Sequence, residues 1–273
     1  MILSDDKPPR KVRYSNTAPR FQYKVWSIPF INRLFKRFPL TGAGTHGRTH
    51  APEGKKKRNM KRKLNVLIAC EESQAECMAF RELGHRAFSC DIQPCRRNTH
   101  PEWHIWGDVT PFLKGRCHFQ TMDGKLHRLP KWDLIIAHPP CTYLCKVSSP
   151  LMVKDGKLCS DRYEKMMEAR EFFMLCLNAQ ADYVAVENPL PMARAQLPKP
   201  DCFIQPTWFG VKYTKKTLYW LKGLPPIMPN ASYPNPKSFL LSSRGKYRSR
   251  TFPEVAKAIA EQWTKFILDD IPG

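Results

Sequence analysis

Residues 131–141 read KWDLIIAHPPC, and this stretch gives the clearest indication of the fold. Its centre, LIIA, is a short continuous apolar run, which is typical of a strand buried on both faces of a parallel sheet. Two prolines follow, and proline cannot donate the backbone hydrogen bond that a sheet strand requires. We therefore expect Cys141 to stand on a stiff loop just beyond the end of a buried strand.

Five further segments have the character of strands, and three have the spacing of helices. The predicted strands are 65–70 (NVLIAC), 85–92 (HRAFSCDI), 104–109 (HIWGDV), 182–189 (DYVAVENP) and 215–223 (KKTLYWLKG). The predicted helices are 74–83, 160–179 and 253–268. Strands that alternate with helices predict an α/β fold with a doubly wound, mostly parallel sheet.

Residues at the helix ends support these boundaries. Gly84 is a natural stop after the first helix. Ser160 or Asp161 can cap the start of the second helix. Pro253 suits the first turn of the third helix, where its missing N–H is not needed.

The residues that follow the strands are mostly polar or reactive. They are Cys70, Glu71 and Glu72 after the first strand, Asp91 after the second, Asp108 after the third, His138 to Cys141 after the fourth, and Glu187 with Asn188 after the fifth. In a doubly wound sheet the carboxyl ends of the parallel strands share one edge, and ligands bind beyond it. The sequence therefore predicts a functional site at the carboxyl edge of the sheet.

Two of these carboxylates suit a cofactor that contains a nucleoside. Asp91 can accept two hydrogen bonds from the hydroxyl groups of a ribose. Asp108 can accept a hydrogen bond from the amino group of an adenine. Each aspartate alone also fits a simpler role, in which its side chain caps the turn after its strand. Together they favour a nucleoside-containing cofactor.

Cys141 and Glu187 are the candidate catalytic residues. A thiolate is a strong nucleophile, and a loop stiffened by two prolines reduces the freedom that Cys141 would lose in a reaction. We expect burial at the end of an apolar strand to raise the pKa of Glu187 and make it a proton donor. The alternatives are an inert buried cysteine and a glutamate held in a salt bridge.

The formal net charge of +21 is unevenly distributed along the 273 residues. Residues 1–63 contain 17 Lys and Arg and three acidic residues, and they include the run KKKRNMKRK at 55–63. This composition predicts a flexible basic arm, residues 1–63, in front of a folded domain, residues 64–273. Such an arm favours a nucleic-acid partner, although a solubilising tail has the same composition.

The cysteines and the apolar runs indicate the compartment. The ten cysteines are scattered and form no CxxC pair, so we expect free thiols and no structural zinc site. The apolar runs are too short for a transmembrane helix, and the start of the chain lacks the apolar stretch of a signal peptide. We therefore expect a cytoplasmic protein without a membrane partner, and a monomer.

The order of the motifs resembles the DNA cytosine-5 methyltransferase family. VLIAC, CDI, GDV, HPPC and VENP appear in that family's order, and EN follows PPC by 46 residues. The resemblance covers roughly residues 64–190 and extends more weakly to 268, where the closing helix is similar to the family's last helix. The short length most resembles members carried by phages and prophages, which would place the protein in the cytoplasm of a bacterial host.

The resemblance implies transfer of a methyl group from S-adenosylmethionine to C5 of a cytosine in DNA. Cys141 would attack C6 of a cytosine that has left the duplex, and Glu187 would hydrogen-bond or protonate N3. The cofactor-binding residues that it implies are Ala69, Cys70, Glu72, Asp91, Ile92, Asp108 and Pro139. The substrate-binding residues that it implies are Pro140, Asn188, Lys215 and Lys216. No metal ion takes part.

The chain departs from the family pattern in three places. ACEESQ at 69–74 has no glycine where the family has glycines, although a carboxylate there can bind the cofactor's ammonium group. Lys215 and Lys216 stand where the family has an arginine, and lysine cannot form the same bidentate contact. About thirty residues, 221–250, replace a large target-recognition region, so we expect limited sequence specificity and phosphate contacts from the basic arm.

Two other functions fit parts of the sequence. A degenerate methyltransferase fold could bind nucleic acid without catalysis, which the missing glycines favour and which Cys141 and Glu187 oppose. A zinc-dependent nucleobase deaminase would use His100 and Glu102 together with Cys141 and Cys145. Against the deaminase, Cys141 follows a strand, whereas the ligand pairs of that pattern begin helices.

Overall fold

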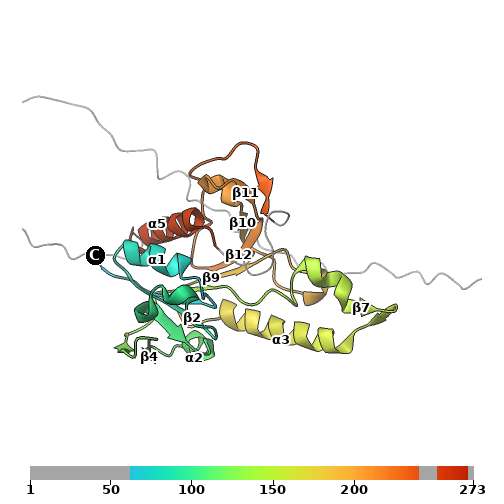
Figure 1. Ribbon diagram of the computed structural model, residues 1–273, viewed down its shortest axis with the longest axis horizontal. Coiled ribbons are helices and arrows are strands. Elements are labelled where there is room, and N and C mark those ends of the chain that lie inside the picture. The colour runs from blue at the N-terminus through green and yellow to red at the C-terminus, as the bar shows by residue number, and fades with distance from the viewer. Residues whose placement is uncertain (1–61, 240–250, 270–273) are drawn as a thin grey trace, which may run out of the picture. The chain divides into compact units, whose positions relative to one another are not determined.

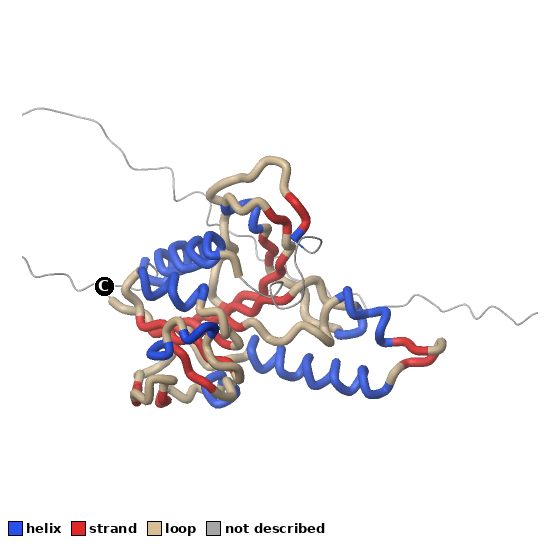
Figure 2. The backbone as a smooth tube through the Cα atoms, viewed as in Figure 1, coloured by secondary structure: helices blue, strands red, loops and turns tan. Residues whose placement is uncertain are grey.

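The computed structural model describes residues 62–239 and 251–269. Nearly all of the predicted basic arm, and the last part of the predicted recognition segment (240–250), lie outside these ranges. The described residues belong to a unit that comprises Arg58–Gly273. This unit has an α/β architecture, with a mostly parallel central sheet between helices, as Figure 1 and Figure 2 show.

Seven strands form the central sheet. They are β1 (Asn65–Ala69), β2 (Arg86–Asp91), β3 (His104–Trp106), β6 (Leu134–Ala137), β9 (Tyr183–Asn188), β10 (Cys202–Ile204) and β12 (Thr217–Lys222). Their order across the sheet is β3-β2-β1-β6-β9-β12-β10. The strands from β3 to β9 are mutually parallel, and β12 runs antiparallel to both of its neighbours. All six predicted strands are confirmed, and the sheet is compatible with a Rossmann-like fold.

The strand order reverses between β1 and β6. The chain leaves β1 toward β2 and β3, and it later returns to add β6 and β9 on the other side of β1. In a doubly wound sheet such a reversal opens a crevice beyond the carboxyl ends of the two central strands. Cys70 follows β1 and His138 follows β6, and the His138 N–H donates to the Ala69 carbonyl at 3.0 Å. The crevice is therefore flanked by two of the predicted strand-end segments.

Helices cover both faces of the sheet. They are α1 (Ala75–Glu82), α2 (Thr110–Leu113), α3 (Ser160–Leu177) and α5 (Pro253–Asp269). α1 and α5 pack together on one face, and α3 covers the other face together with the short α2 (Figure 1). In β1, Leu67 belongs to the core beneath α3, whereas Val66 and Ile68 belong to the core beneath α1 and α5. Within the described ranges, no helix combines the length and the apolar character needed to cross a membrane.

The end of α1 follows the prediction. Gly84 has a φ of 86°, a left-handed value that glycine adopts without strain. Its N–H donates to the Arg81 carbonyl at 2.8 Å, and the N–H of His85 donates to the Phe80 carbonyl at 3.1 Å. These two bonds satisfy carbonyl groups that the end of a helix leaves without partners.

The predicted start of α5 is confirmed, whereas the predicted cap of α3 is wrong. α5 begins at Pro253, as predicted. The prediction for α3 is wrong: Cys159 holds the N-cap position, and no side chain caps the helix. Ser160 is already helical and donates its hydroxyl hydrogen to Asp161 at 3.4 Å. The cap is missing because the helix already begins at Ser160, and Cys159, which holds the cap position, has no side-chain oxygen to accept a backbone N–H.

Several short elements lacked a readable signal in the sequence. The short strand pairs are β4 (His118–Gln120) with β5 (Leu126–Arg128), β7 (Val153–Lys154) with β8 (Lys157–Leu158), and β11 (Tyr213–Thr214) with β13 (Lys237–Ser238). The 3-10 helices are Arg96–Asn98, Pro101–Trp103, Lys146–Met152, Ala193–Ala195 and Pro206–Phe209. All of these elements except Lys146–Met152 have two to four residues and are too short to display a hydrophobic period. All ten cysteines are free, as predicted.

Three buried tryptophans anchor irregular segments to the core. Their indole N–H groups donate to backbone carbonyls, from Trp132 to Arg116, from Trp220 to Pro198 and from Trp263 to Pro225, at 2.8 to 3.0 Å. A buried indole N–H without a partner would cost about 1–3 kcal/mol, so these bonds fix the segments as well as the rings. The proline-rich chain on both sides of β12 is held in this way.

Candidate active site

Backbone hydrogen bonds tie together the two loops that carry the predicted catalytic pair. Cys141 lies on the loop after β6, and Glu187 stands at the end of β9, which is the neighbour of β6 in the sheet. Beyond the strands, the N–H groups of Lys146 and Met192 each donate to a carbonyl of the opposite loop at 2.7 Å. These two hydrogen bonds add to the pairing of β6 with β9, and they hold the Cys141 loop against the chain that follows Glu187.

Cys141 is half-buried, and its thiol is protonated near neutral pH. Burial, together with the charges of Glu187 and Cys145, raises the pKa of the Cys141 thiol to about 11. The charge of Lys215 acts in the opposite direction. A thiolate mechanism at Cys141 therefore needs the proton to leave when a substrate enters.

His138 lies between two carboxylates. Its Nδ1 is 3.3 Å from Glu187 Oε2, and its Nε2 is 3.2 Å from Glu76 Oε2. Glu76 stands in the first turn of α1 and is fully buried. A protonated imidazole donates from both nitrogens, so it satisfies both carboxylates at once. The three side chains form a row from α1, past the end of β6, to the end of β9.

The pKa values in this row depend on charge more than on burial. Burial lowers the pKa of His138, but the charge of Glu76 and the hydrogen bonds with Glu187 and Glu76 hold it well above its ordinary value. Burial raises the pKa of Glu187, but the hydrogen bond from His138 and the charge of Lys215 leave it below its ordinary value. The expected rise of the Glu187 pKa is therefore wrong, because adjacent cations outweigh desolvation. The proton of this row resides on His138.

Lys215 and Lys216 have different surroundings. Both precede β12, which is antiparallel to β9, so the start of β12 lies beside the end of β9 and Leu218 pairs with Asn188. The charge of Lys215 acts on Glu187 and on Cys141. Lys216 is exposed, and its Nζ lies 4.3 Å from the centroid of the Phe203 ring. Only Lys215 of the two predicted lysines joins the catalytic pair.

The loop after β1 makes a glycine-like turn without glycine. Cys70 has a φ of 61° and Gln74 a φ of 60°, values that cost roughly 1–2 kcal/mol for a residue with a side chain. The Cys70 N–H donates to the Cys90 carbonyl at 2.7 Å, which holds this turn against β2. The missing glycines therefore do not prevent the chain from turning sharply at the end of β1.

Glu71 occupies the amino end of α1. Its Oε1 accepts a hydrogen bond from the Glu76 N–H at 2.8 Å, and its Oε2 accepts one from the Cys77 N–H at 3.3 Å. Burial and the neighbouring charge of Glu76 raise the pKa of Glu71 to about 7. In dinucleotide-binding folds, open N–H groups at this position bind phosphate. Because a carboxylate already takes these donors, the site does not suit a cofactor with a pyrophosphate.

Glu72 forms an ion pair with Arg96. The Arg96 Nε donates to Glu72 Oε2 at 2.8 Å, and its Nη2 contacts Oε1. The Arg96 N–H also donates to the Glu72 carbonyl at 2.8 Å, so the loop after β1 is tied to the loop after β2. The carboxylate that we expected to meet an ammonium group thus already has a cation.

Asp91 and Asp108 each bind the turn that follows their own strand. Asp91 Oδ1 accepts a hydrogen bond from the Gln93 N–H at 2.8 Å, and Asp108 Oδ1 accepts one from the Thr110 N–H at 2.9 Å. The turn-capping alternative is therefore present at both positions, through one oxygen of each carboxylate. Burial is the main cause of the raised pKa of the Cys70 thiol, and the charges of Cys176 and of both aspartates raise it further.

Ile92 and Trp106 add an exposed apolar surface beside Asp91. Their exposed fractions are 75% and 62%, and the Trp106 Nε1 donates to the Ile92 carbonyl at 3.0 Å. Trp106 pairs with Asp91 in the register of β2 and β3. A flat indole next to a carboxylate suits a purine ring and its ribose. The sequence interpretation included Ile92 and missed Trp106.

The remaining predicted residues occupy mostly interior positions. Ala69 and Pro139 are buried, whereas Pro140 is exposed. Asn188 is fully buried, and its Nδ2 donates to the Pro189 carbonyl at 2.7 Å. Its Oδ1 has no hydrogen-bond partner among the described residues. Asn188 thus orders the turn after Glu187 from inside the protein.

The residues of the deaminase hypothesis do not form one site. His100 Nδ1 is 3.0 Å from Glu102 Oε1, and its ring stacks on Trp103, immediately before β3. Cys141 and Cys145 follow β6, on a different part of the sheet. In the described part of the chain, no group of three or more His, Cys, Asp or Glu side chains can hold a metal ion.

Two residues that shape the candidate site carried only weak sequence signals. Glu76 lies on the buried face of a predicted amphipathic helix, and an acid in that position is a signal of a buried partner. Trp106 becomes a neighbour of Asp91 only through the register of β2 with β3. His138 and Glu187 were both predicted as strand-end residues, but the hydrogen bonds of His138 to Glu187 and to Glu76 were not.

Comparison with known proteins assigns no family to this chain. No protein-family model matches it, and no curated protein matches it in sequence. Its function must therefore be inferred from the geometry of its own residues.

Proposed function

We propose that this chain methylates C5 of cytosine in DNA, with S-adenosylmethionine as the methyl donor. The observation that carries the proposal is the pairing of the two loops that hold Cys141 and Glu187 together at the carboxyl edge of an α/β sheet. Lys215 adds a positive charge to the same corner. A nucleophile, a proton-bearing pair and a cation are the groups that addition to a pyrimidine ring requires.

The ends of β1, β2 and β3 fit the proposed cofactor. Oδ1 of Asp91 and of Asp108 serves the local turn, and the second oxygen of each is the acceptor for ribose or adenine. Ile92 and Trp106 supply apolar surface for the adenine ring. The Glu71 carboxylate at the start of α1 opposes a pyrophosphate but not a cationic sulfonium or amino group. S-adenosylmethionine held there would supply the methyl group.

The reaction assigns one task to each residue of the catalytic pair. The Cys141 thiol first loses its proton to solvent water, and the thiolate then forms a bond from its sulfur to C6 of a cytosine flipped out of the duplex. Glu187 stabilises the charge that develops on the ring at N3, and C5 becomes nucleophilic. After C5 has been methylated, its proton passes to solvent water. The electrons of that C–H bond re-form the double bond between C5 and C6, the bond between C6 and Cys141 breaks, and the thiolate leaves.

In this proposal His138 and Glu187 act together as one acid. Glu187 is ionised in the free protein, and the available proton is on His138. That proton passes from His138 Nδ1 to Glu187, and Glu187 passes it on to N3, so the imidazole becomes neutral and Glu187 is again a carboxylate. Glu76 keeps the imidazole in place during the transfer, because it hydrogen-bonds the other ring nitrogen.

A methyl-transfer assay tests the proposal. Wild type, Cys141→Ser and the matched control Cys145→Ser would be incubated with cytosine-containing DNA and labelled S-adenosylmethionine, and the digested nucleosides analysed. We expect 5-methylcytosine from wild type and Cys145→Ser and none from Cys141→Ser. Equal product from Cys141→Ser would contradict the proposed nucleophile.

Two observations favour nucleic-acid binding without catalysis as a second candidate. Glu72 is already paired with Arg96, and the Cys141 thiol is protonated in the free protein. In that function the wild type binds DNA but produces no 5-methylcytosine from any cytosine-containing DNA. The same assay, combined with a DNA-binding titration, separates the two candidates.

A further inference from the structure

A cavity of about 440 Å³ lies away from the candidate active site. Its lining includes Lys63, which precedes β1, and Arg86, which begins β2. These residues mark the amino ends of the two strands, whereas Cys141 and Glu187 lie at the carboxyl edge. The cavity is therefore a second site at the opposite edge of the sheet.

The lining of this cavity is basic. Lys63, Arg81 and Arg86 are cations, and Glu82 is the only acid among the described residues that line it. None of the three cations forms a salt bridge within residues 62–239 and 251–269. A concave surface lined with cations that form no salt bridge attracts a polyanion.

Arg81 is held in place by its surroundings. Its Nε donates to the Ala87 carbonyl at 2.7 Å. Its guanidinium carbon lies 4.6 Å from the centroid of the Phe88 ring and 5.0 Å from that of the Trp103 ring. Burial lowers the pKa of Arg81, so a bound anion would relieve an electrostatic cost. Because the side chain is already ordered, binding an anion would cost little further entropy.

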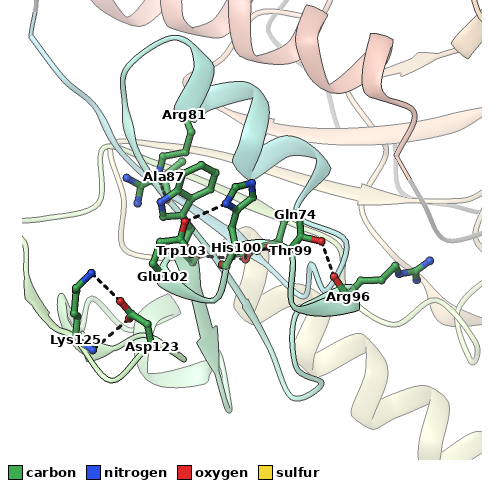
Figure 3. Close-up of polar contacts among 11 residues, drawn as sticks. Gln74, Arg81, Ala87, Arg96, Thr99, His100, Glu102, Trp103, Asp123 and Lys125 are labelled. Atoms are coloured by element: carbon green, nitrogen blue, oxygen red, sulfur yellow. Dashed lines mark hydrogen bonds and ion pairs between the residues drawn. The ribbon is translucent and has the colours of Figure 1, made fainter.

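An aromatic stack continues from this cation. The His100 ring stacks on Trp103 with centroids 3.8 Å apart and an interplanar angle of 14°. Glu102 accepts a hydrogen bond from His100 Nδ1 at 3.0 Å, and Figure 3 shows Trp103 between Arg81 and His100. The His100 side chain is 33% exposed. Cations next to an exposed aromatic ring are what nucleic-acid-binding surfaces present to a phosphate and its base.

The sequence connects this cavity to the basic arm. The run KKKRNMKRK at 55–63 ends at Lys63, which lines the cavity. The last cation of this basic run is therefore also a lining residue of the cavity. We propose that the cavity binds the phosphate backbone of a second segment of nucleic acid, away from the base that enters the active site.

A paired charge removal tests this second site in the full-length protein. The cavity variant is Lys63→Gln with Arg86→Gln, both exposed, and the control is Lys154→Gln with Lys157→Gln, both exposed on the β7–β8 hairpin. Binding of a labelled DNA duplex would be titrated by fluorescence anisotropy at several NaCl concentrations. For the cavity variant we expect a Kd about tenfold higher and a salt dependence reduced by about two counterions. No change, or an equal change in the control, would overturn the proposal.

Two additional measurements identify the ligand and keep the test separate from catalysis. Inorganic phosphate and AMP would compete against the labelled duplex at equal ionic strength. Equal, weak competition supports a backbone contact, whereas displacement by AMP at much lower concentration would overturn it in favour of a free nucleotide. The binding result stands even if wild type yields no 5-methylcytosine, because it does not require methyl transfer.

Discussion

The two halves of the carboxyl edge satisfy their polar groups in different ways. Beyond β6 and β9, His138 and Glu187 bind one another, and Glu76 completes the row. Beyond β2 and β3, Oδ1 of Asp91 and of Asp108 accepts a hydrogen bond from the turn that follows its own strand, and each carboxylate has a second oxygen. The first half is arranged for proton movement between protein groups. In the proposed function the second half accepts hydrogen bonds from a ligand.

The largest expected effect is the loss of kcat on substitution of Glu187, which belongs to the half of the edge beyond β6 and β9. Glu187→Gln removes the group that passes a proton to the base, so kcat for methyl transfer should fall by about 10²–10⁴-fold. Affinity for S-adenosylmethionine, measured by calorimetry, should remain unchanged because that ligand belongs to the other half. Glu164→Gln, an exposed change on α3, is the control. If Glu187→Gln weakened the binding of S-adenosylmethionine as much as it lowered kcat, the two halves of the edge would not have separate functions.

The second prediction concerns the stability of the same row. His138→Gln removes the cation between Glu76 and Glu187 and leaves Glu187 with only the charge of Lys215. Breaking a buried ion pair costs about 3–5 kcal/mol. Thermal denaturation should show a clear fall in Tm, whereas the exposed change His118→Gln should have little effect.

The pH dependence of this loss has a defined sign. The pKa of Glu187 is lowered, so its contribution is present above its ordinary value of 4.5 and is lost as pH falls through its folded pKa. The pKa of His138 is raised, so its contribution is present below its ordinary value of 6.5 and is lost as pH rises through its folded pKa. The difference in Tm between wild type and His138→Gln should be greatest between about pH 4.5 and 6.5. A difference that is constant with pH would point to a packing effect.

The third prediction concerns Asp91, in the half of the edge beyond β2 and β3. Asp91→Asn preserves an oxygen for the Gln93 N–H but removes the charge that strengthens hydrogen bonds to a ribose. The Kd for S-adenosylmethionine should rise by about ten- to a hundredfold, and kcat at saturating cofactor should change little. Asp155→Asn, on the β7–β8 hairpin, is the matched control. If kcat fell and affinity did not, Asp91 would belong functionally with the catalytic half.

The smallest expected effect is on the rate of Cys141 alkylation, which tests whether the charge of Glu187 raises the pKa of the thiol. In the free protein, alkylation of Cys141 by iodoacetamide should increase about tenfold per pH unit up to its pKa of about 11. Glu187→Gln removes a charge that raises this pKa, so labelling at pH 8 should be several-fold faster. Mass spectrometry would report Cys141 separately from the other cysteines. Slower labelling would show that Glu187 does not act on the thiol through its charge.

Local sequence signals determined much of the fold. LIIA, VLIA and YVAV are continuous apolar runs, and each becomes a strand buried on both faces because only such a position removes both sides from water. The residues after these runs share an edge because parallel strands end together. The sequence alone could therefore group Cys141 with Glu187, and Asp91 with Asp108.

Tertiary contacts decided what these groups can do. The bonds of His138 to Glu187 and to Glu76 join residues 49 and 62 positions apart, and no local pattern encodes them. Lys215 reaches the pair because β12 enters the sheet antiparallel to β9. The pKa of a carboxyl depends on every charge within a few ångströms, whichever part of the chain supplies it. For this reason the sequence located Glu187 at the edge of the sheet, whereas only the folded chain determined that its proton is held by His138.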